Sequence, residues 1–251
     1  MYKIHILKYA DWFAPGTTSY DHAYGIHAPQ KICLVGFLVQ GNGRNIMIDT
    51  GMDGIDQTYT PEDKERWDHL SKSRDTADLL KEKGLTLDDI DTVILTHLHF
   101  DHYINAPLYK KARFHVPRIE WEYIQDPLNL PACPIVGFPR EPLAYLAGEA
   151  FDRLTLTEDG DEPVDGIKLH WTGGHSPGHM VVSVPTKDGK VIVVGDAFYL
   201  YEQIEKDIPL GYRTNVIEVM QGYRFLREQK ATLLPAHDYD IFNRHPDLTI
   251  G

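Results

Sequence analysis

Three histidines and an aspartate lie within seven consecutive positions, in the segment THLHFDH at residues 96–102. Imidazole nitrogens and carboxylate oxygens are ligands that suit borderline divalent ions such as Zn²⁺ or Mn²⁺. In an extended segment His97 and His99 face the same side, and a following turn brings Asp101 and His102 toward a second position nearby. The segment alone is also compatible with an acid–base cluster or a polar loop, so the rest of the chain has to decide.

Three more candidate ligands stand alone, each at the end of a hydrophobic run. His175 follows IKLHWTGG, Asp196 follows VIVVG and His237 follows ATLLPA. Strand ends are rigid and their loops gather along one edge of a sheet, so side chains distant in sequence can meet there. Seven candidates exceed the ligands of one tetrahedral ion, and a carboxylate can bridge two ions. The sequence therefore predicts two metals, with His179 in a structural role beside them.

The elements that must position these residues follow from the hydropathy pattern. Helical spacing covers 75–83 and 215–229, and the turn QGNGRN at 40–45 predicts a hairpin. Strand-like runs alternate with helices in both halves, which predicts an α+β fold of two packed sheets covered by helices, in a single domain over residues 1–251. The strand-like runs are 3–9, 32–39, 45–50, 92–97, 112–117, 167–172, 180–185, 190–196 and 231–237.

Two stretches rich in Pro, Gly and aromatic residues, 10–31 and 125–148, resist assignment. Loops of this length are uncommon unless they bind something, so they are candidate walls of a pocket. Coverage of the sandwich edge by ordinary core residues explains them equally well. The aromatic side chains concerned are Trp12, Phe13, Tyr20, Tyr24, Phe138 and Tyr145.

Composition limits the partners. A formal net charge of −12 argues against nucleic acid and against anionic membrane surfaces as partners. Cys33 and Cys133 stand far apart, which argues against a disulfide framework and a thiolate zinc site and suits a reducing compartment. The N-terminus MYKIHILKYADWF has neither a signal peptide nor a membrane anchor pattern, so the expected location is the cytoplasm. The oligomeric state stays open, a dimer included.

Five segments, in order, resemble the metallo-β-lactamase superfamily: MIDTGM (47–52), HLHFDH (97–102), GGHSPGH (173–179), GDAFY (195–199) and PAHD (235–238). The resemblance implies an αββα sandwich of two mixed sheets flanked by helices, with a dinuclear site at one edge. Within the superfamily the chain is similar to the N-acyl-homoserine lactonases in length, in HLHFDH and GHSPGH, and in Tyr199 three residues after Asp196. A departure is Tyr103, where that branch commonly has a small residue.

The resemblance implies two divalent ions, zinc first, with manganese, cobalt or iron as alternatives. Asp49 would hydrogen-bond ligand residues and hold their orientation. The ligands of one ion would be His97, His99 and His175, those of the other Asp101, His102 and His237, with Asp196 as the bridge.

The implied reaction is the opening of a lactone, N-acyl-homoserine lactone above all, by a bridging hydroxide that attacks the carbonyl. Tyr199 would stabilise the carbonyl oxygen, although packing alone would also explain a tyrosine there, and Asp101 would protonate the leaving alkoxide. Another lactone such as a pyridoxolactone, an ester, a thioester or a cyclic amide stays open. The acidic charge disfavours a phosphodiesterase. Retention of all seven ligand positions disfavours a non-catalytic metal-binding protein, and His99 stands where the oxygen-reducing di-iron members have a carboxylate.

Overall fold

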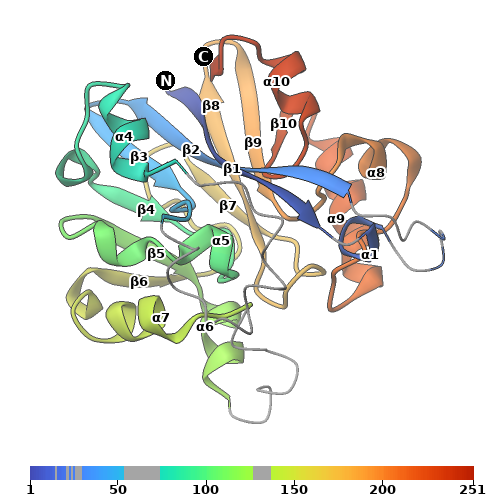
Figure 1. The fold of residues 1–251 in the computed structure, drawn as a ribbon, viewed down its shortest axis with the longest axis horizontal. Helices are drawn as coiled ribbons and strands as arrows, with labels where there is room; N and C mark the ends of the chain where they lie inside the picture. The colour runs from blue at the N-terminus through green and yellow to red at the C-terminus, as the bar shows by residue number, and fades with distance from the viewer. Residues whose placement is uncertain (15, 21–22, 24, 26–29, 54–73, 127–136) are drawn as a thin grey trace.

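A computed structural model of the chain describes residues 1–14, 16–20, 23, 25, 30–53, 74–126 and 137–251, except for the side chains at 13 and 17. The first sheet has seven strands in the order β11-β1-β2-β3-β4-β5-β6 (Figure 1). It is mixed, because pairing is antiparallel from β11 to β3 and parallel from β3 to β6. Its strands are β1 (Lys3–Ala14), β2 (Gln30–Gly41), β3 (Arg44–Ile48), β4 (Thr92–Ile94), β5 (Arg113–Pro117), β6 (Leu154–Thr157) and β11 (Thr249–Ile250).

The predicted hairpin joins β2 to β3. Asn42 and Gly43 have φ angles of 51° and 73°, the left-handed conformation that a two-residue type I′ turn needs. Gly41 pairs with Arg44 at the turn, and Phe37 pairs with Ile48 at the far end. This register delivers Asp49, the residue after β3, to the edge where β4 ends.

The second sheet has the order β10-β9-β8-β7 and is also mixed, since β10 runs parallel to β9 and the other pairs are antiparallel. Most residues of the central pair, β8 and β9, are buried aliphatic residues, as expected for strands covered on both faces. The strands are β7 (Lys168–Trp171), β8 (Met180–Thr186), β9 (Gly189–Gly195) and β10 (Thr232–Pro235).

Alternation along β2 divides the core into two clusters. Val35 and Phe37 face the second sheet, whereas Leu34 and Leu38 face the helices on the other side. Helices α4 (Thr76–Lys81), α5 (Phe100–Tyr103) and α7 (Arg140–Ala147) cover the first sheet, and α8 (Tyr201–Lys206), α9 (Val216–Glu228) and α10 (Asp240–Arg244) cover the second (Figure 1). The predicted αββα sandwich is confirmed.

Each predicted strand run contains a strand, and both predicted helices are present as α4 and α9. The unassigned stretches hold regular structure that the pattern did not reveal. β1 continues to Ala14 through an irregular register between Lys8 and Ala10, and α1 (Gly16–Ser19) follows. In the second stretch α7 carries Pro142 in its first turn, where the missing N–H costs no helical bond.

Cys33 is buried and unbridged, and Cys133 lies outside the described residues. Among the helices of the described ranges, none has the length and apolar character needed to cross a membrane.

Candidate metal centre

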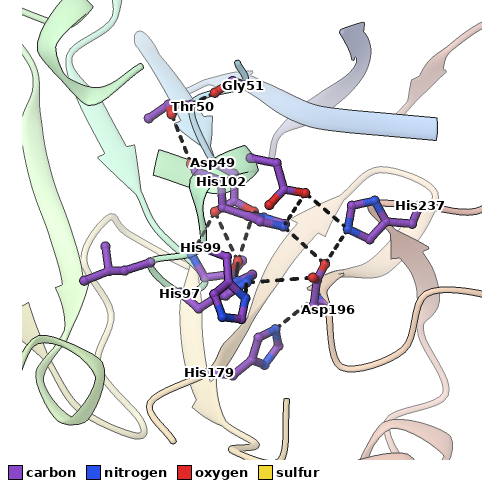
Figure 2. A network of polar contacts seen from close by, with 12 residues as sticks. Asp49, Thr50, Gly51, His97, His99, His102, His179, Asp196 and His237 are labelled. Atoms are coloured by element: carbon purple, nitrogen blue, oxygen red, sulfur yellow. Dashed lines mark hydrogen bonds and ion pairs between the residues drawn. The ribbon is translucent and has the colours of Figure 1, made fainter. Parts of the chain in front are cut away.

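All seven predicted ligands meet at one edge of the two sheets. Figure 2 shows five of them there: His97, His99, His102, Asp196 and His237. The segment after β4 carries four of them, His175 precedes β8, Asp196 follows β9 directly, and His237 lies two residues after β10. Every one of these side chains is at most 7% exposed. The strand ends therefore assemble a buried cluster from residues that span 140 positions of the sequence.

The first group contains three imidazoles whose nitrogens point at one another. His99 Nδ1 lies 2.9 Å from His97 Nε2 and 2.8 Å from His175 Nε2, and the last two atoms are 3.2 Å apart. Two nitrogens bound at about 2.1 Å to a tetrahedral ion lie about 3.4 Å apart. The three nitrogens therefore have nearly the mutual spacing that one ion requires.

In His175 and His97 the hydrogen bond made by Nδ1 determines that Nε2, which faces the other imidazoles, carries no proton. His175 Nδ1 lies 2.9 Å from the carbonyl oxygen of Tyr212, which can only accept, so the proton is on Nδ1 and Nε2 presents a lone pair. His97 Nδ1 lies 3.0 Å from Thr96 Oγ1. The Thr96 hydroxyl itself donates to Asp49, 3.0 Å away, so its oxygen accepts from His97.

The second group repeats this arrangement. Asp101 Oδ2 lies 3.5 Å from His102 Nε2 and 3.6 Å from His237 Nε2. His102 Nδ1 faces Asp49 Oδ2 at 2.8 Å, and His237 Nδ1 faces the carbonyl oxygen of Cys33 at 2.9 Å. Both partners are acceptors, so both histidines also present Nε2 to the interior of the cluster.

Asp196 lies between the two groups. Its Oδ2 is 3.2 Å from His175 Nε2, while its Oδ1 is 3.0 Å from His237 Nε2 and 3.2 Å from His102 Nε2. The backbone N–H of Asp196 donates to His179 Nε2 at 3.0 Å, and His179 Nδ1 lies 2.8 Å from Thr172 Oγ1. His179 thus holds the Asp196 backbone with Nε2 and contacts Thr172 with Nδ1, in keeping with a structural role.

Burial controls the protonation of the cluster. It lowers the pKa values of His97 and His99 well below the usual range and that of His175 to about 4, so these rings are neutral near pH 7. Burial raises the pKa of Asp101. Burial also acts to raise the pKa of Asp196, but the neighbouring His237 and other imidazoles outweigh it and hold that pKa well below its usual value.

Two buried polar atoms indicate what the cluster is built to hold. His102 Nε2 and Asp196 Oδ1 have no hydrogen-bond partner within the described ranges of the chain, although they lie only 3.2 Å apart. Unpaired polar atoms in a protein interior are costly, and a cation among them would satisfy both. The donor set of imidazole nitrogens and carboxylate oxygens therefore fits divalent ions of the zinc type.

A family model described as the metallo-beta-lactamase superfamily matches residues 33–237, a range that includes every residue of the cluster. The chain belongs to this superfamily. Among curated proteins it is 28% identical to an N-acyl homoserine lactonase of Bacillus cereus over 141 residues, which are 53% of this chain and 48% of that protein. It is 25% identical to a probable metallo-hydrolase of Mycobacterium tuberculosis over an alignment of 252 positions, gaps included, which covers 91% of this chain and 75% of that protein.

The matched region spans about half the length of the curated lactonases. Solved structures agree with the fold over nearly the whole chain. An N-acyl homoserine lactone hydrolase with the product N-hexanoyl-L-homoserine at its catalytic metal centre superposes with a TM-score of 0.77 at 20% identity, over 96% of this chain and 95% of that one. A probable metal-dependent hydrolase from Staphylococcus aureus gives 0.78 at 21% identity, over 94% and 89%.

Tyr199 lies against the cluster of this metallo-β-lactamase superfamily member. It is 4% exposed, and its ring centroid is 4.6 Å from that of His237 and 5.8 Å from that of His175. Burial first, and then the negative charges of Asp196 and Asp101, raise the pKa of its phenol well above the usual range. The phenol therefore keeps its proton at neutral pH.

A cavity of about 360 Å³ adjoins the first group of ligands. Phe138, from one of the unassigned stretches, lines it, and its ring centroid lies 4.7 Å from that of His99. No pattern in the sequence indicates the other aromatic and cationic walls. The residues that line the cavity are His99, Tyr123, Phe138, His175, Ser176, Pro177, Tyr212, Arg213 and Thr214.

The other candidate wall residues that are described lie elsewhere. Tyr145 is buried in the core under α7, the Trp12 ring packs edge-on against Phe100, and the Tyr20 hydroxyl donates to Glu202 at 3.1 Å. The described contacts of these three residues are core packing and a hydrogen bond between elements, and none of the three lines this cavity. The Phe13 side chain, Tyr24 and residues 127–136 lie outside the described part of the chain.

Tyr103 does not line the cavity but contacts the segment that forms one of its walls. It is the last residue of α5 and is fully buried in the core, and its hydroxyl donates to the carbonyl oxygen of Pro139. The Phe100 N–H donates to Gly137 O at 2.9 Å. Helix α5 therefore holds the segment that carries Phe138, so the bulky residue shapes the cavity by anchoring its wall.

Proposed function

We propose that this protein is a dinuclear metal-dependent hydrolase that opens lactone rings, with N-acyl-homoserine lactones as the leading substrates. The observation that carries the proposal is the position of the Asp196 carboxylate, which offers one oxygen to each group of ligands, 3.2 Å from His175 and 3.0 Å from His237. A carboxylate in this position can join two ions. The ligands proposed are His97, His99 and His175 for one ion, Asp101, His102 and His237 for the other, and Asp196 for both.

When bound, the two ions would supply an activated water and a Lewis acid for the substrate carbonyl. The protein's own contribution begins with Tyr199, whose phenol donates a hydrogen bond to the carbonyl oxygen as that atom gains negative charge. Its raised pKa, caused first by burial, keeps the proton on the phenol at neutral pH. The side chain of Gln203 accepts from the backbone N–H of Tyr199 at 2.8 Å and so fixes the start of this segment.

Asp101 is the proposed carrier of the proton. It accepts the proton of the attacking water, and when the ring C–O bond breaks it returns that proton to the leaving alkoxide. Burial raises the pKa of its carboxyl, which brings it closer to a value suited to transfer in both directions. The carboxylate oxygen lies between His102 and His237, 3.5 Å and 3.6 Å away, so it stays close to the reacting atoms throughout.

Two findings support a lactone with an apolar acyl chain. The curated relatives that match part of this chain are N-acyl homoserine lactonases. The cavity beside His99 and His175 has aromatic walls from Tyr123, Phe138 and Tyr212, which suit an aliphatic chain.

Arg213 favours a second candidate. Its guanidinium lies on the wall of the same cavity and is held there by its Nη1, which donates to Leu210 O at 2.6 Å and to Gly211 O at 3.1 Å. A cation on a cavity wall that also carries polar side chains would attract a carboxylate or phosphate group of a substrate. The second candidate is therefore a hydrolase of a lactone or ester that carries an anionic group, with the same metal chemistry.

The experiment is a proton-release assay with protein reloaded with zinc, manganese or cobalt. The panel contains homoserine lactones of several acyl lengths, neutral lactones and esters, anionic lactones and esters, and a phosphodiester. We expect homoserine lactones to be opened fastest, and no turnover after removal of the metal. Turnover of anionic substrates alone would replace the first candidate with the second, and turnover of the phosphodiester alone would contradict both.

A further inference from the structure

A carboxylate outside the proposed ligand set is completely buried next to the metal centre. Glu120 lies in the first turn of α6 (Arg118–Gln125), the helix that follows β5, and its side chain is 0% exposed. Charged side chains are almost never fully buried unless they are paired or hydrogen-bonded. The hydrogen-bond partners of the Glu120 carboxylate therefore indicate its role.

Glu120 contacts the two loops that carry the first group of ligands. Its Oε1 accepts the backbone N–H of Leu98 at 3.3 Å, and its Oε2 accepts that of Gly178 at 2.9 Å. Leu98 lies between His97 and His99, and Gly178 lies three residues after His175. One loop leaves β4 of the first sheet and the other enters β8 of the second, so a single carboxylate joins the two sheets at the site.

Gly178 packs directly against the backbone of Glu120. A Cβ atom at this position would lie 2.1 Å from the Glu120 nitrogen and 2.5 Å from its Cα. Only glycine can therefore bring the loop against the first turn of α6. The backbone N–H of Met180 donates to Thr96 O at 2.9 Å and so connects the ends of β8 and β4. The hydrogen bonds of Glu120 are a second connection between the same two loops, next to the candidate ligands.

We propose that Glu120 is a positioning residue that holds the 96–102 and 173–179 loops at the separation at which the nitrogens of His97, His99 and His175 meet. The inference rests on the proposed metal centre. The second group has anchors of its own: Asp49 and the Thr50 N–H hold His102, and the Cys33 carbonyl holds His237. Loss of Glu120 should therefore weaken metal binding by the first group and leave the second nearly unchanged.

The test compares Glu120→Gln with Glu122→Gln, the same change on the exposed side of the same helix. Each is made in a His237→Ala background, which leaves the first group intact, and in a His175→Ala background, which leaves the second. Zinc affinity is measured by competition with a chromophoric chelator. Because a residue that orients ligands typically changes metal affinity by 10–100-fold, we expect Glu120→Gln to weaken zinc binding at least about tenfold in the His237→Ala background only. Glu122→Gln should change neither.

The proposal would be overturned if Glu120→Gln left the zinc affinity of the His237→Ala protein unchanged. It would also be overturned if Glu120→Gln weakened zinc binding equally in both backgrounds, because that result indicates a general loss of structure. The proposed function fails separately, if the zinc affinities behave as expected but no lactone is opened.

Amide hydrogen exchange on the wild-type protein gives a second test that does not require a variant to fold. Peptides containing Leu98 and Gly178 should remain slow to exchange after the metal is removed, because Glu120 still holds both N–H groups. Fast exchange in both peptides on metal removal would show that the ions hold the loops and would overturn the proposal.

Discussion

Asp49 offers a sharp test of how the second group of ligands is oriented. Its Oδ1 accepts the backbone N–H of Thr96 at 2.9 Å, and its Oδ2 faces His102 Nδ1 at 2.8 Å. In Asp49→Asn the amide oxygen would keep the bond to Thr96, and the amide NH₂ would then face His102. Since that group only donates, His102 would have to move its proton from Nδ1 to Nε2, the nitrogen proposed to bind the ion. Asparagine tolerates the positive φ of 61° at this position, so the backbone should not suffer.

The magnitude follows from the burial of both partners. Asp49 and His102 are each 1% exposed, so solvent does not weaken their interaction. A hydrogen bond to a charged group contributes about 1.5–3 kcal/mol, and about 2 kcal/mol corresponds to roughly a thirtyfold change in an equilibrium constant. We expect Asp49→Asn to weaken zinc binding by the second group by about 10–100-fold, in line with other residues that orient metal ligands.

The assay is chelator competition with zinc in the His175→Ala background, where the second group binds alone. Asp188→Asn serves as the control, because Asp188 is exposed in the turn between β8 and β9, at the end of the strands away from the cluster. Zinc affinity within a factor of two of the parent would refute the reasoning, since it would mean that His102 does not depend on Asp49 for its orientation. The thermal stability of the metal-free proteins is compared in parallel to exclude unfolding.

Four further outcomes are expected. Tyr199→Phe should lower kcat by about 10–100-fold with unchanged metal content, since a donor to the carbonyl oxygen acts in the transition state; full activity in the metal-loaded variant would remove it from the mechanism. Phe138→Ala should raise KM for long-chain homoserine lactones more than for short ones, which a chain-length series would measure, and an equal effect at every length would place the acyl chain elsewhere. Burial lowers the pKa of His115 to about 4, so the unfolded chain binds a proton at this residue more readily than the folded protein does. Acidification from pH 6.5 to 4 should therefore lower the free energy of unfolding by up to about 3 kcal/mol, a loss that His115→Gln should not show. Denaturant midpoints that fall equally with pH in the parent and in His115→Gln would contradict this. Burial raises the pKa of Cys33 to about 12, so its thiol should resist iodoacetamide at pH 8 until the protein is unfolded, and rapid labelling seen by peptide mass spectrometry would show otherwise.

The convergence of the candidate ligands could be predicted from the sequence for a physical reason. The ligand types are rare, and each stands where a strongly hydrophobic strand ends, so their convergence follows from the layout of the sheets. A structural role for His179 could also be predicted, because a glycine-rich turn places it just before β8. In the structure its two nitrogens hold Asp196 and contact Thr172.

Glu120 could not be found from the sequence. The helix RIEWEYIQ contains a second glutamate, Glu122, two positions later, and nothing in the pattern separates the buried carboxylate from the exposed one. The difference arises only when α6 packs against the loop at Gly178. The cavity walls were equally hidden, because Tyr212 and Arg213 lie in a short connection whose position depends on backbone bonds to Thr18 and Ser19 near the N-terminus.

Helix α7 does not follow from the local pattern, because its segment begins with prolines, which are typical of an irregular loop. In the structure Pro139 precedes the helix and Pro142 lies in its first turn, where proline is tolerated. The helix is then stabilised by tertiary packing, because Tyr145 and Leu146 are buried against the first sheet. Short helices of this kind depend on contacts that are not visible in local sequence.

The most direct test of the central claim is a zinc titration of metal-free protein, in which ions bound per chain and the rate of homoserine-lactone opening are measured in the same samples. A dinuclear centre joined by Asp196 predicts that activity rises steeply only as the second ion binds and reaches its plateau at two ions per chain. Full activity at one ion per chain, or two bound ions with no lactone opened, would contradict the account.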